Sequence, residues 1–150
     1  NEELKRIEAL ITRCLQQAAP LARRVQLLAS APGIARVTAS SLCAGLPELG
    51  RYGRRAISAL SGLAPLARDS GAHHGQRHIA GGRALPLVAL YQATLSALRF
   101  NPPIKALYQR LKAKGKPSKV AMTACMRHLL CMLNAMVRDD RPWAYPAAMS

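Results

Sequence analysis

Acidic residues are scarce in this sequence, which contains 7 Asp and Glu residues against 22 Lys and Arg residues in 150 positions. Between positions 9 and 138 only Glu48 and Asp69 are acidic, and the pair Asp139-Asp140 stands near the C-terminal end. Enzymes that cut nucleic acids with two metal ions need several convergent carboxylates. The sequence offers no such cluster, so we expect neither a metal site nor a cofactor in this chain.

The sequence also has few features of a disulfide framework, a zinc site or a membrane span. Its four cysteines show no Cys-x-x-Cys spacing and lie in apolar helical patterns, which is typical of buried, reduced thiols. They are Cys14, Cys43, Cys125 and Cys131. His74 and His78 are four residues apart, but a complete set of zinc ligands is lacking. Because there is no secretory leader and no uncharged apolar run of about 18 residues, we expect a cytoplasmic protein.

Basic residues are abundant and clustered. The formal net charge of +15 exceeds what solubility requires and predicts a polyanionic partner, of which nucleic acid is the first candidate. One block comprises Arg51, Arg54, Arg55, Arg68, Arg77 and Arg83, and a second comprises Lys105, Arg110, Lys112, Lys114, Lys116 and Lys119. A charge run is often only a solvated face. The near absence of acids favours phosphate contacts instead, which give affinity but little sequence information.

The spacing of apolar residues predicts an all-α domain with an N-terminal heptad helix. From Leu4 to Leu28 the apolar positions alternate between spacings of three and four residues, and Pro20 is expected to break or kink this helix near Ala19. Segment 1–29 is either an amphipathic helix that folds back onto its own domain, or a coiled-coil arm that dimerises or leads to a missing N-terminal domain. The chain starts without Met in this pattern, so we expect a fragment of a longer protein.

Helix-breaking and helix-capping residues predict the remaining helices, which would form one domain at 30–138. A short helix at 54–60 would end at Gly62, and an apolar repeat from 83 to 100 places Pro86 in a first turn. Asn101 is a predicted N-cap, and Ser118 is expected to cap the last helix. The core stripe of that helix is predicted to contain Val120, Ala124, Leu130, Leu133 and Val137, with Met122, Met126, Met132 and Met136 as core filler. The tail, 139–150, lacks periodicity and is expected to be flexible.

Residues 30–45 look like a helix-hairpin-helix DNA-binding motif. A tight turn at Pro32-Gly33-Ile34 separates two helical patterns. In this motif the backbone N–H groups of the turn and of the next helix hold a phosphate, which would here involve Gly33, Ile34, Ala35 and Arg36. The usual second glycine is replaced by Ala35. The alternative is a structural turn with Ile34 in the core.

A loop rich in glycine and basic residues interrupts the helical patterns at 62–82. It places Ser70-Gly71 near Arg77, His78 and Arg83. Glycine allows a ligand to approach the backbone closely, and arginine presents planar paired donors that match phosphate oxygens. A serine hydroxyl needs activation before it can act as a nucleophile, so the residues alone leave a turn or N-cap serine as the alternative.

These motifs occur in an order that resembles the C-terminal domain of the insertion sequence 110 family of transposases, which are relatives of the pilin-inversion recombinase. The resemblance covers most of residues 27 to 138. Its motifs are Pro32-Gly33-Ile34, Val37-Thr38-Ala39, Gly62-Leu63-Ala64-Pro65 with Ser70-Gly71, Asn101-Pro102, the stretch from Tyr108 to Leu111, Gly115-Lys116-Pro117 and the segment from Ala121 to Leu130. The basic residues that the family tends to carry near Pro86 and Leu87 are absent.

The resemblance implies a serine transesterification on DNA. Ser70 would attack the scissile phosphate, Arg77 and Arg83 would stabilise the charge that develops on its oxygens, and a DNA hydroxyl would later displace the phosphoserine link. Gly71, His78, Lys112 and Lys116 are further expected phosphate contacts.

The resemblance also implies partners that this chain lacks. An N-terminal RNase-H-like domain would supply acidic residues that bind Mg²⁺ and complete the site, and some family members are guided by an RNA of the element. We therefore expect a bacterial, nucleoid-associated protein that binds transposon ends and target DNA and oligomerises through helix 4–28. Alone, this chain is expected to bind DNA without recombining it.

Two other classes of protein stay open at this point. A non-catalytic DNA- or RNA-binding domain would need only the basic faces and the hairpin. A protein-interaction module would depend on the heptad helix and would show little salt-sensitive affinity for DNA.

Overall fold

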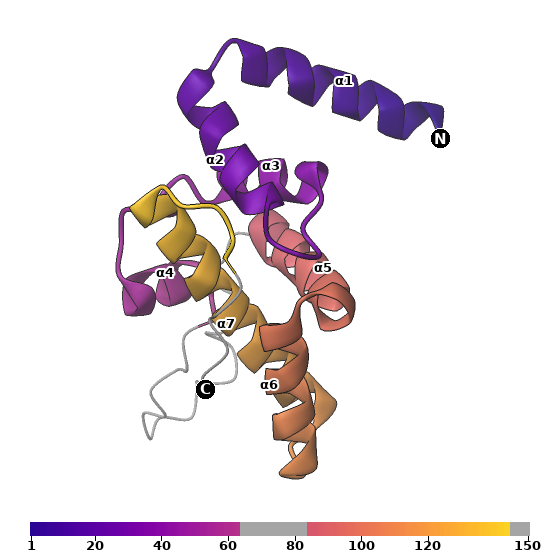
Figure 1. The fold of residues 1–150 in the computed structure, drawn as a ribbon, viewed down its shortest axis with the longest axis vertical. Coiled ribbons are helices and arrows are strands. Elements are labelled where there is room, and N and C mark those ends of the chain that lie inside the picture. Colours follow the sequence, from indigo (N-terminus) through magenta and orange to yellow (C-terminus); the bar gives the residue numbers. More distant parts are fainter. Residues whose placement is uncertain (64–83, 145–150) are drawn as a thin grey trace.

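The computed structural model describes residues 1–63 and 84–144, and these two ranges fold into an all-α domain (Figure 1). The helices in order are α1 (Glu2–Gln16), α2 (Ala19–Ala29), α3 (Arg36–Gly45), α4 (Arg54–Leu60), α5 (Ala84–Phe100), α6 (Pro102–Ala113) and α7 (Ser118–Asp139). No strand occurs in the described ranges. The predicted all-α fold class is therefore confirmed.

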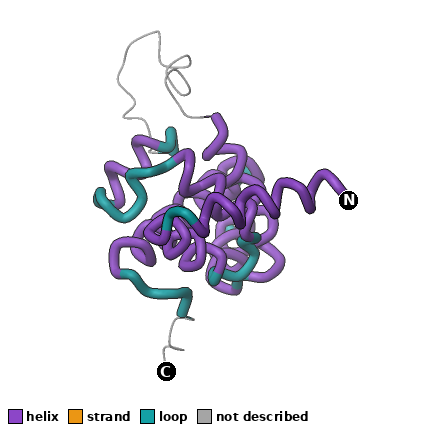
Figure 2. The backbone as a smooth tube through the Cα atoms, turned by 90° about the horizontal axis from the view of Figure 1, so that it is seen from above, coloured by secondary structure: helices purple, strands orange, loops and turns teal. Residues whose placement is uncertain are grey.

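The predicted heptad helix is two helices. α1 ends at Gln16 and α2 begins at Ala19, with Pro20 in the first turn of α2, where its missing N–H removes no helical hydrogen bond. This confirms the expected break near Ala19. α1 extends away from the bundle (Figures 1 and 2), and three of its apolar side chains are exposed. The exposed fractions of Leu4, Ile7 and Leu10 are 49%, 41% and 58%.

The turn between α2 and α3 packs against α5 through a glycine. Gly33 has a φ of +91°, which L side chains rarely adopt. A Cβ atom on Gly33 would lie 2.8 Å from the backbone N of Ala97 and 2.9 Å from its Cα. The turn can therefore approach the backbone of α5 this closely only with glycine at this position.

The long helix α7 forms the centre of the core and contacts α2, α4, α5 and α6. Its buried residues are Ala121, Cys125, Met126, Leu129, Leu130, Leu133, Asn134 and Met136. This stripe differs from the prediction at its start, because Val120 is 50% exposed and the core face begins at Ala121. Ser118 is not the N-cap either, since Pro117 occupies the cap position.

The start of α6 follows the prediction and ties two turns together. Asn101 is the N-cap, fully buried, and its Oδ1 accepts a hydrogen bond from the backbone N–H of Ile104 at 3.4 Å. Its Nδ2 donates to the backbone oxygen of Pro32 at 3.4 Å. The side chain that starts α6 thus also holds the α2–α3 turn.

Two polar side chains hold the connection from α3 to α4. Asn134 of α7 accepts from the N–H of Gly50 at 2.7 Å and donates to the carbonyl of Tyr52 at 2.9 Å. Arg24 of α2 donates to the carbonyls of Pro47 and Leu49 at 3.1 Å and 2.8 Å. These bonds satisfy backbone groups of a turn that has no regular structure, and they hold the segment that leads into α4.

The first residues after α7 make specific contacts, although the tail 139–150 is predicted to be flexible. Arg23 forms an ion pair with Asp140 at 3.0 Å. The backbone N–H of Trp143 donates to Ser30 Oγ at 2.9 Å, and the partly buried indole packs against the core. Residues 145–150 lie outside the described ranges.

The four cysteines are free thiols, and one of them differs from the expectation. Cys43 and Cys125 are buried, Cys131 is half-buried, and Cys14 is exposed on α1. Burial raises the pKa of Cys43 to about 11, an effect that the nearby Arg24 guanidinium partly opposes. Cys14 is exposed because α1 extends away from the rest of the bundle (Figure 1).

One helix in the described ranges, α7, is long and apolar enough to cross a membrane by length and composition. It has 22 residues and a mean hydropathy of 1.4. The core helix of a soluble protein passes the same test, and the apolar stripe of α7 is packed against four other helices.

Candidate nucleic-acid interface

The predicted hairpin site contributes mainly to the fold. Gly33 faces the backbone of α5, and Ile34 is 6% exposed and belongs to the core. The N–H of Ile34 donates to the carbonyl of Ala31 within the turn, at 3.1 Å. Ala35 occupies the N-cap of α3 without a capping side chain. Phosphate binding by a helix-hairpin-helix motif stays a prediction. Ile34 lies in the core, as expected from the alternative that this segment is a structural turn.

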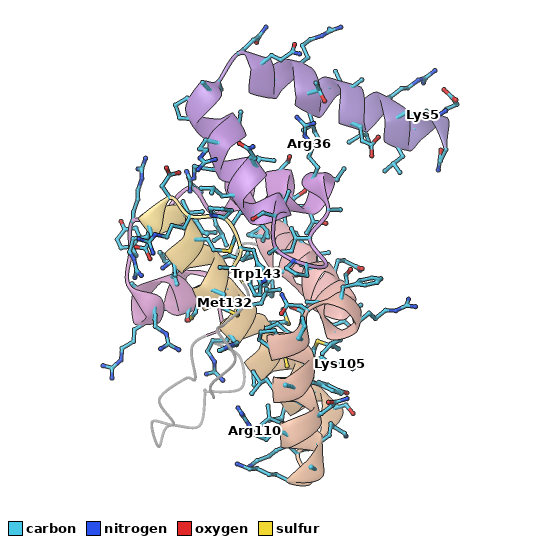
Figure 3. The ribbon with its side chains drawn as sticks, viewed as in Figure 1. Lys5, Arg36, Lys105, Arg110, Met132 and Trp143 are labelled. Atoms are coloured by element: carbon cyan, nitrogen blue, oxygen red, sulfur yellow. The ribbon has the colours of Figure 1, made fainter. Side chains whose placement is uncertain are left out.

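Arg36, the last residue of that predicted set, lies at the start of α3 beneath α1. It is exposed, and its side chain extends toward α1 (Figure 3). It lines a cavity of about 310 Å³ together with Glu8, Ile11, Thr12 and Val37. A phosphate at this helix N-terminus would therefore have to share the space between α1 and α3.

The structure separates the lysines predicted to bind phosphate from the hairpin. Lys112 and Lys116 are exposed at the turn from α6 to α7, at the opposite end of the long axis from α1 (Figure 1). Lys112 Nζ donates to Ser118 Oγ at 3.0 Å. The predicted DNA contacts therefore belong to at least two separate surfaces.

Most of the predicted catalytic loop, from 64 onward, lies outside the described residues, and so do Ser70, Gly71, Arg77, His78 and Arg83. The loop is therefore described only up to its two attachment points, Leu63 after α4 and Ala84 at the start of α5.

The N-terminal attachment point is well defined. Gly62, with a φ of +78°, ends α4 as predicted. The N–H of Leu63 donates to the carbonyl of Ser58 at 2.8 Å, and the N–H of Gly62 donates to the carbonyl of Ala59 at 3.1 Å. This pair of bonds is the Schellman pattern of a helix C-terminus. The residues that precede the loop are thus anchored to the helical core.

A further group of basic side chains lies next to a cavity elsewhere in the described chain. We call this cavity the cationic pocket. It has a volume of about 680 Å³ and lies between α4, α6 and α7. Its lining residues are Arg54, Arg55, Ser58, Ala59, Leu107, Ala124, Arg127, His128 and Cys131. Arginine side chains from α4 and α7 thus line the same cationic pocket as a histidine and several apolar side chains.

Charge and burial both act on the histidine of this pocket. The pKa of His128 is lowered from its ordinary value of 6.5, first by burial and then by the positive charges of Arg54 and Arg110. The pocket thus disfavours the protonated, charged form of His128. In Figure 3, Arg110 and Lys105 extend from different sides of α6, and neither lines the pocket, to which α6 contributes Leu107.

The described residues around the pocket include no acid. Every residue between 84 and 137 that carries a full charge is basic. The ion pairs at Lys5, Arg23 and Arg138 all lie outside the pocket. No acidic side chain is among the described residues that line the pocket, and this positive lining favours an anionic ligand.

Sequence reasoning found Arg54, Arg55 and Arg110 as members of basic blocks but missed Arg127 and His128. The signal in the sequence was an adjacent Arg-His pair inside the otherwise apolar stretch from Ala124 to Leu133, at positions three and four residues from Ala124 and Cys131. Because spacing along α7 places Ala124, Arg127 and Cys131 on one face, a polar gap in the core stripe could have been recognised.

Comparison with known proteins agrees with the motif order. The Transposase IS116/IS110/IS902 family matches residues 25–109, a range that runs from α2 into α6. The 43.6 kDa protein of insertion element IS110 from Streptomyces coelicolor is 28% identical over 141 residues, which is 93% of this chain and 34% of that protein. The pilin gene-inverting protein of Moraxella bovis is 26% identical over 147 residues, or 95% of this chain and 46% of that protein.

A shorter match has higher identity. The 42 kDa protein of insertion element IS900 from Mycobacterium paratuberculosis is 36% identical over 85 residues, which is 55% of this chain and 21% of that protein. The chain thus spans less than half the length of each of these relatives. Since the family match covers more than half of this chain and includes the whole segment from Gly62 to Arg83, the chain belongs to the Transposase IS116/IS110/IS902 family.

Proposed function

We propose that this chain is the C-terminal part of a DNA transposase or recombinase, in which it binds DNA and supplies Ser70 as the nucleophile for strand cleavage and transfer. The observation that carries the proposal is the family match across residues 25–109, which includes Ser70-Gly71 and the helices on both sides of it. The name of the Moraxella relative, a pilin gene-inverting protein, supports a recombination reaction.

The chemistry we propose is an exchange of phosphoester bonds. Ser70 Oγ bonds to the scissile phosphorus as the bond from phosphorus to one DNA hydroxyl breaks, and a second DNA hydroxyl later displaces the serine. Each step makes one phosphoester bond and breaks one, so no nucleotide or redox cofactor is needed. Arg77 and Arg83 would stabilise charge on the phosphate oxygens in the transition state.

The described part of the chain does not fit a catalytic metal. It contains no group of three His, Cys, Asp or Glu residues that could hold an ion. We propose that Mg²⁺ is held by an N-terminal RNase-H-like domain of the same protein, which would supply the acidic ligands.

DNA binding is supported by the distribution of charge. The side chains of α6 and of its turn into α7 include Lys105, Arg110, Lys112, Lys114 and Lys116, with no acidic residue among them. Phosphate contacts of this kind release counterions, so that affinity falls steeply with salt. A salt-independent affinity for duplex DNA would contradict the proposal.

The decisive experiment replaces Ser70 in the full-length protein and uses DNA that carries the ends of the element. Ser70→Ala should abolish both recombination and the covalent protein-DNA adduct on a denaturing gel. Ser41→Ala is the matched control, because Ser41 is an exposed serine that bonds to the Val37 carbonyl of its own helix. If Ser70→Ala recombines normally, or if the native protein forms no adduct, the chain is a non-catalytic DNA- or RNA-binding domain.

We propose further that α1 mediates assembly with a second copy of the protein. The exposed side chains of Leu4, Ile7 and Leu10 support this, because they leave an apolar surface on α1 that a second helix could cover. Ile7→Glu in the full-length protein should lower the mass measured by light scattering. An unchanged mass would remove α1 from the interface.

A further inference from the structure

The cationic pocket has no role in the serine chemistry proposed above. We propose that it binds one unpaired nucleotide of a nucleic-acid strand, with the base against its apolar wall and the phosphate at its arginines. The inference rests on the proposed function in one respect, which is that nucleic acid is the partner of the protein.

The apolar wall of the pocket comes from three helices. Ala59 of α4, Leu107 of α6 and Ala124 of α7 line it. The cavity volume of about 680 Å³ falls in the range of pockets that enclose small organic ligands. The two alanines carry only methyl groups, so they leave room for a flat ring. A base that enters would remove apolar surface from water, which a bare phosphate would not do.

The rim of the pocket supplies the groups that a nucleotide phosphate needs. Arg54 and Arg55 approach from α4 and Arg127 from α7. None of the three forms an ion pair within the described ranges. Guanidinium groups bind phosphate through paired donors and also stack on bases. Charge and apolar surface at the same place thus match the two chemical parts of a nucleotide.

The histidine adds a group suited to the edge of a base. The pocket favours the neutral form of His128, because burial and the charges of Arg54 and Arg110 lower its pKa. A neutral imidazole carries one hydrogen-bond donor and one acceptor. The base must be unpaired, since a base within a duplex is stacked and its Watson-Crick edge is occupied.

The test compares strands that have the same charge but differ in their bases. The affinity of the full-length protein is measured by fluorescence anisotropy for an oligothymidylate and for an abasic strand of the same length. We expect the oligothymidylate to bind at least about fivefold tighter, because entry of a base removes apolar surface from water. An oligouridylate of that length shows whether the nucleotide comes from DNA or RNA, and tight binding of either supports the site.

Two variants fill the cavity without changing its charge. Ala124→Leu and Ala59→Leu should remove the preference for base-bearing strands and leave the affinity for the abasic strand unchanged. Ala59 is exposed on its helix, so Ala59→Leu keeps the test valid if Ala124→Leu fails to fold. Ala113→Leu, at an exposed position at the end of α6 and outside the pocket, is the matched control and should keep the preference.

The proposal is overturned if the native protein binds both strands equally, or if the two filled variants keep the preference. It is also overturned if a glutamate peptide displaces the oligothymidylate as well as an unlabelled strand does. Failure of the proposed function gives a different result, because duplex DNA would then bind without salt dependence. A steep salt dependence without base preference refutes the pocket alone.

Discussion

The glycine in the α2–α3 turn offers a sharp test of the fold. Gly33→Ala should destabilise the protein for two reasons. The φ of +91° costs an L residue about 1–2 kcal/mol. The added Cβ would lie 2.8 Å from the backbone N of Ala97 and 3.0 Å from the carbonyl carbon of Ser96. These atoms belong to the α5 helix and cannot rotate away, so overpacking should cost about a further 1–3 kcal/mol.

The chain contains a matched control for the first of these two terms. Gly115 has a φ of +81°, but a Cβ there would meet no atom within 4 Å. Gly115→Ala should therefore cost only about 1–2 kcal/mol, the conformational term. The difference between the two variants isolates the packing of the turn against α5.

Urea denaturation followed by circular dichroism measures both variants, with the free energy of unfolding obtained by linear extrapolation. We expect Gly33→Ala to lose about 2–5 kcal/mol in total, a large fraction of the stability of a small domain. If Gly33→Ala loses no more than Gly115→Ala, the turn does not pack on the backbone of α5. Gly33 would then be explained better by the predicted phosphate contact.

Three further predictions concern buried polar groups and thiols. Asn134→Ala should cost about 2–4 kcal/mol in the same urea assay, because the Gly50 N–H and the Tyr52 carbonyl both lose their partner; a loss below about 0.5 kcal/mol would contradict this bonding. The pKa of His128 in the folded protein is below its ordinary value of 6.5, so the unfolded chain binds more protons as the pH falls below 6.5. The free energy of unfolding should therefore decrease as the pH falls below 6.5. His128→Gln should flatten the fall in unfolding free energy between about pH 7 and pH 5, and identical slopes would refute the assignment. Iodoacetamide at about pH 8 should label Cys14 first and Cys43 only after unfolding, since Cys14 is exposed and burial raises the pKa of Cys43 to about 11; mass spectrometry of the native protein gives the order, and early labelling of Cys43 would contradict its burial.

Local signals in the sequence were sufficient for the helix limits that proline and glycine set. The break at Pro20, the helix from Arg54 to Leu60 and the cap at Asn101 were all predicted and found. Each depends on a missing N–H, a positive φ or a side chain that reaches its own helix. These effects involve residues close in sequence, and for this reason the helix limits can be predicted without knowledge of the tertiary structure.

The order of motifs likewise determined the family, because it requires no contact between distant residues. The charge of the chain pointed to nucleic acid for the same reason, since it is a sum over the whole sequence. The roles of Ser70, Arg77 and Arg83 stay predictions, and these residues lie outside the described ranges.

Only the tertiary structure decided which basic side chains act together. Arg24 and Arg54 add the same charge to the sequence, yet Arg24 donates hydrogen bonds to the carbonyls of Pro47 and Leu49. Arg54 and Arg127 are far apart in sequence, and they meet at one pocket because α4 packs against α7. Whether a basic side chain bonds to backbone carbonyls of its own chain or faces a cavity depends on the helices around it. The periodicity along one helix contains no information about those neighbouring helices.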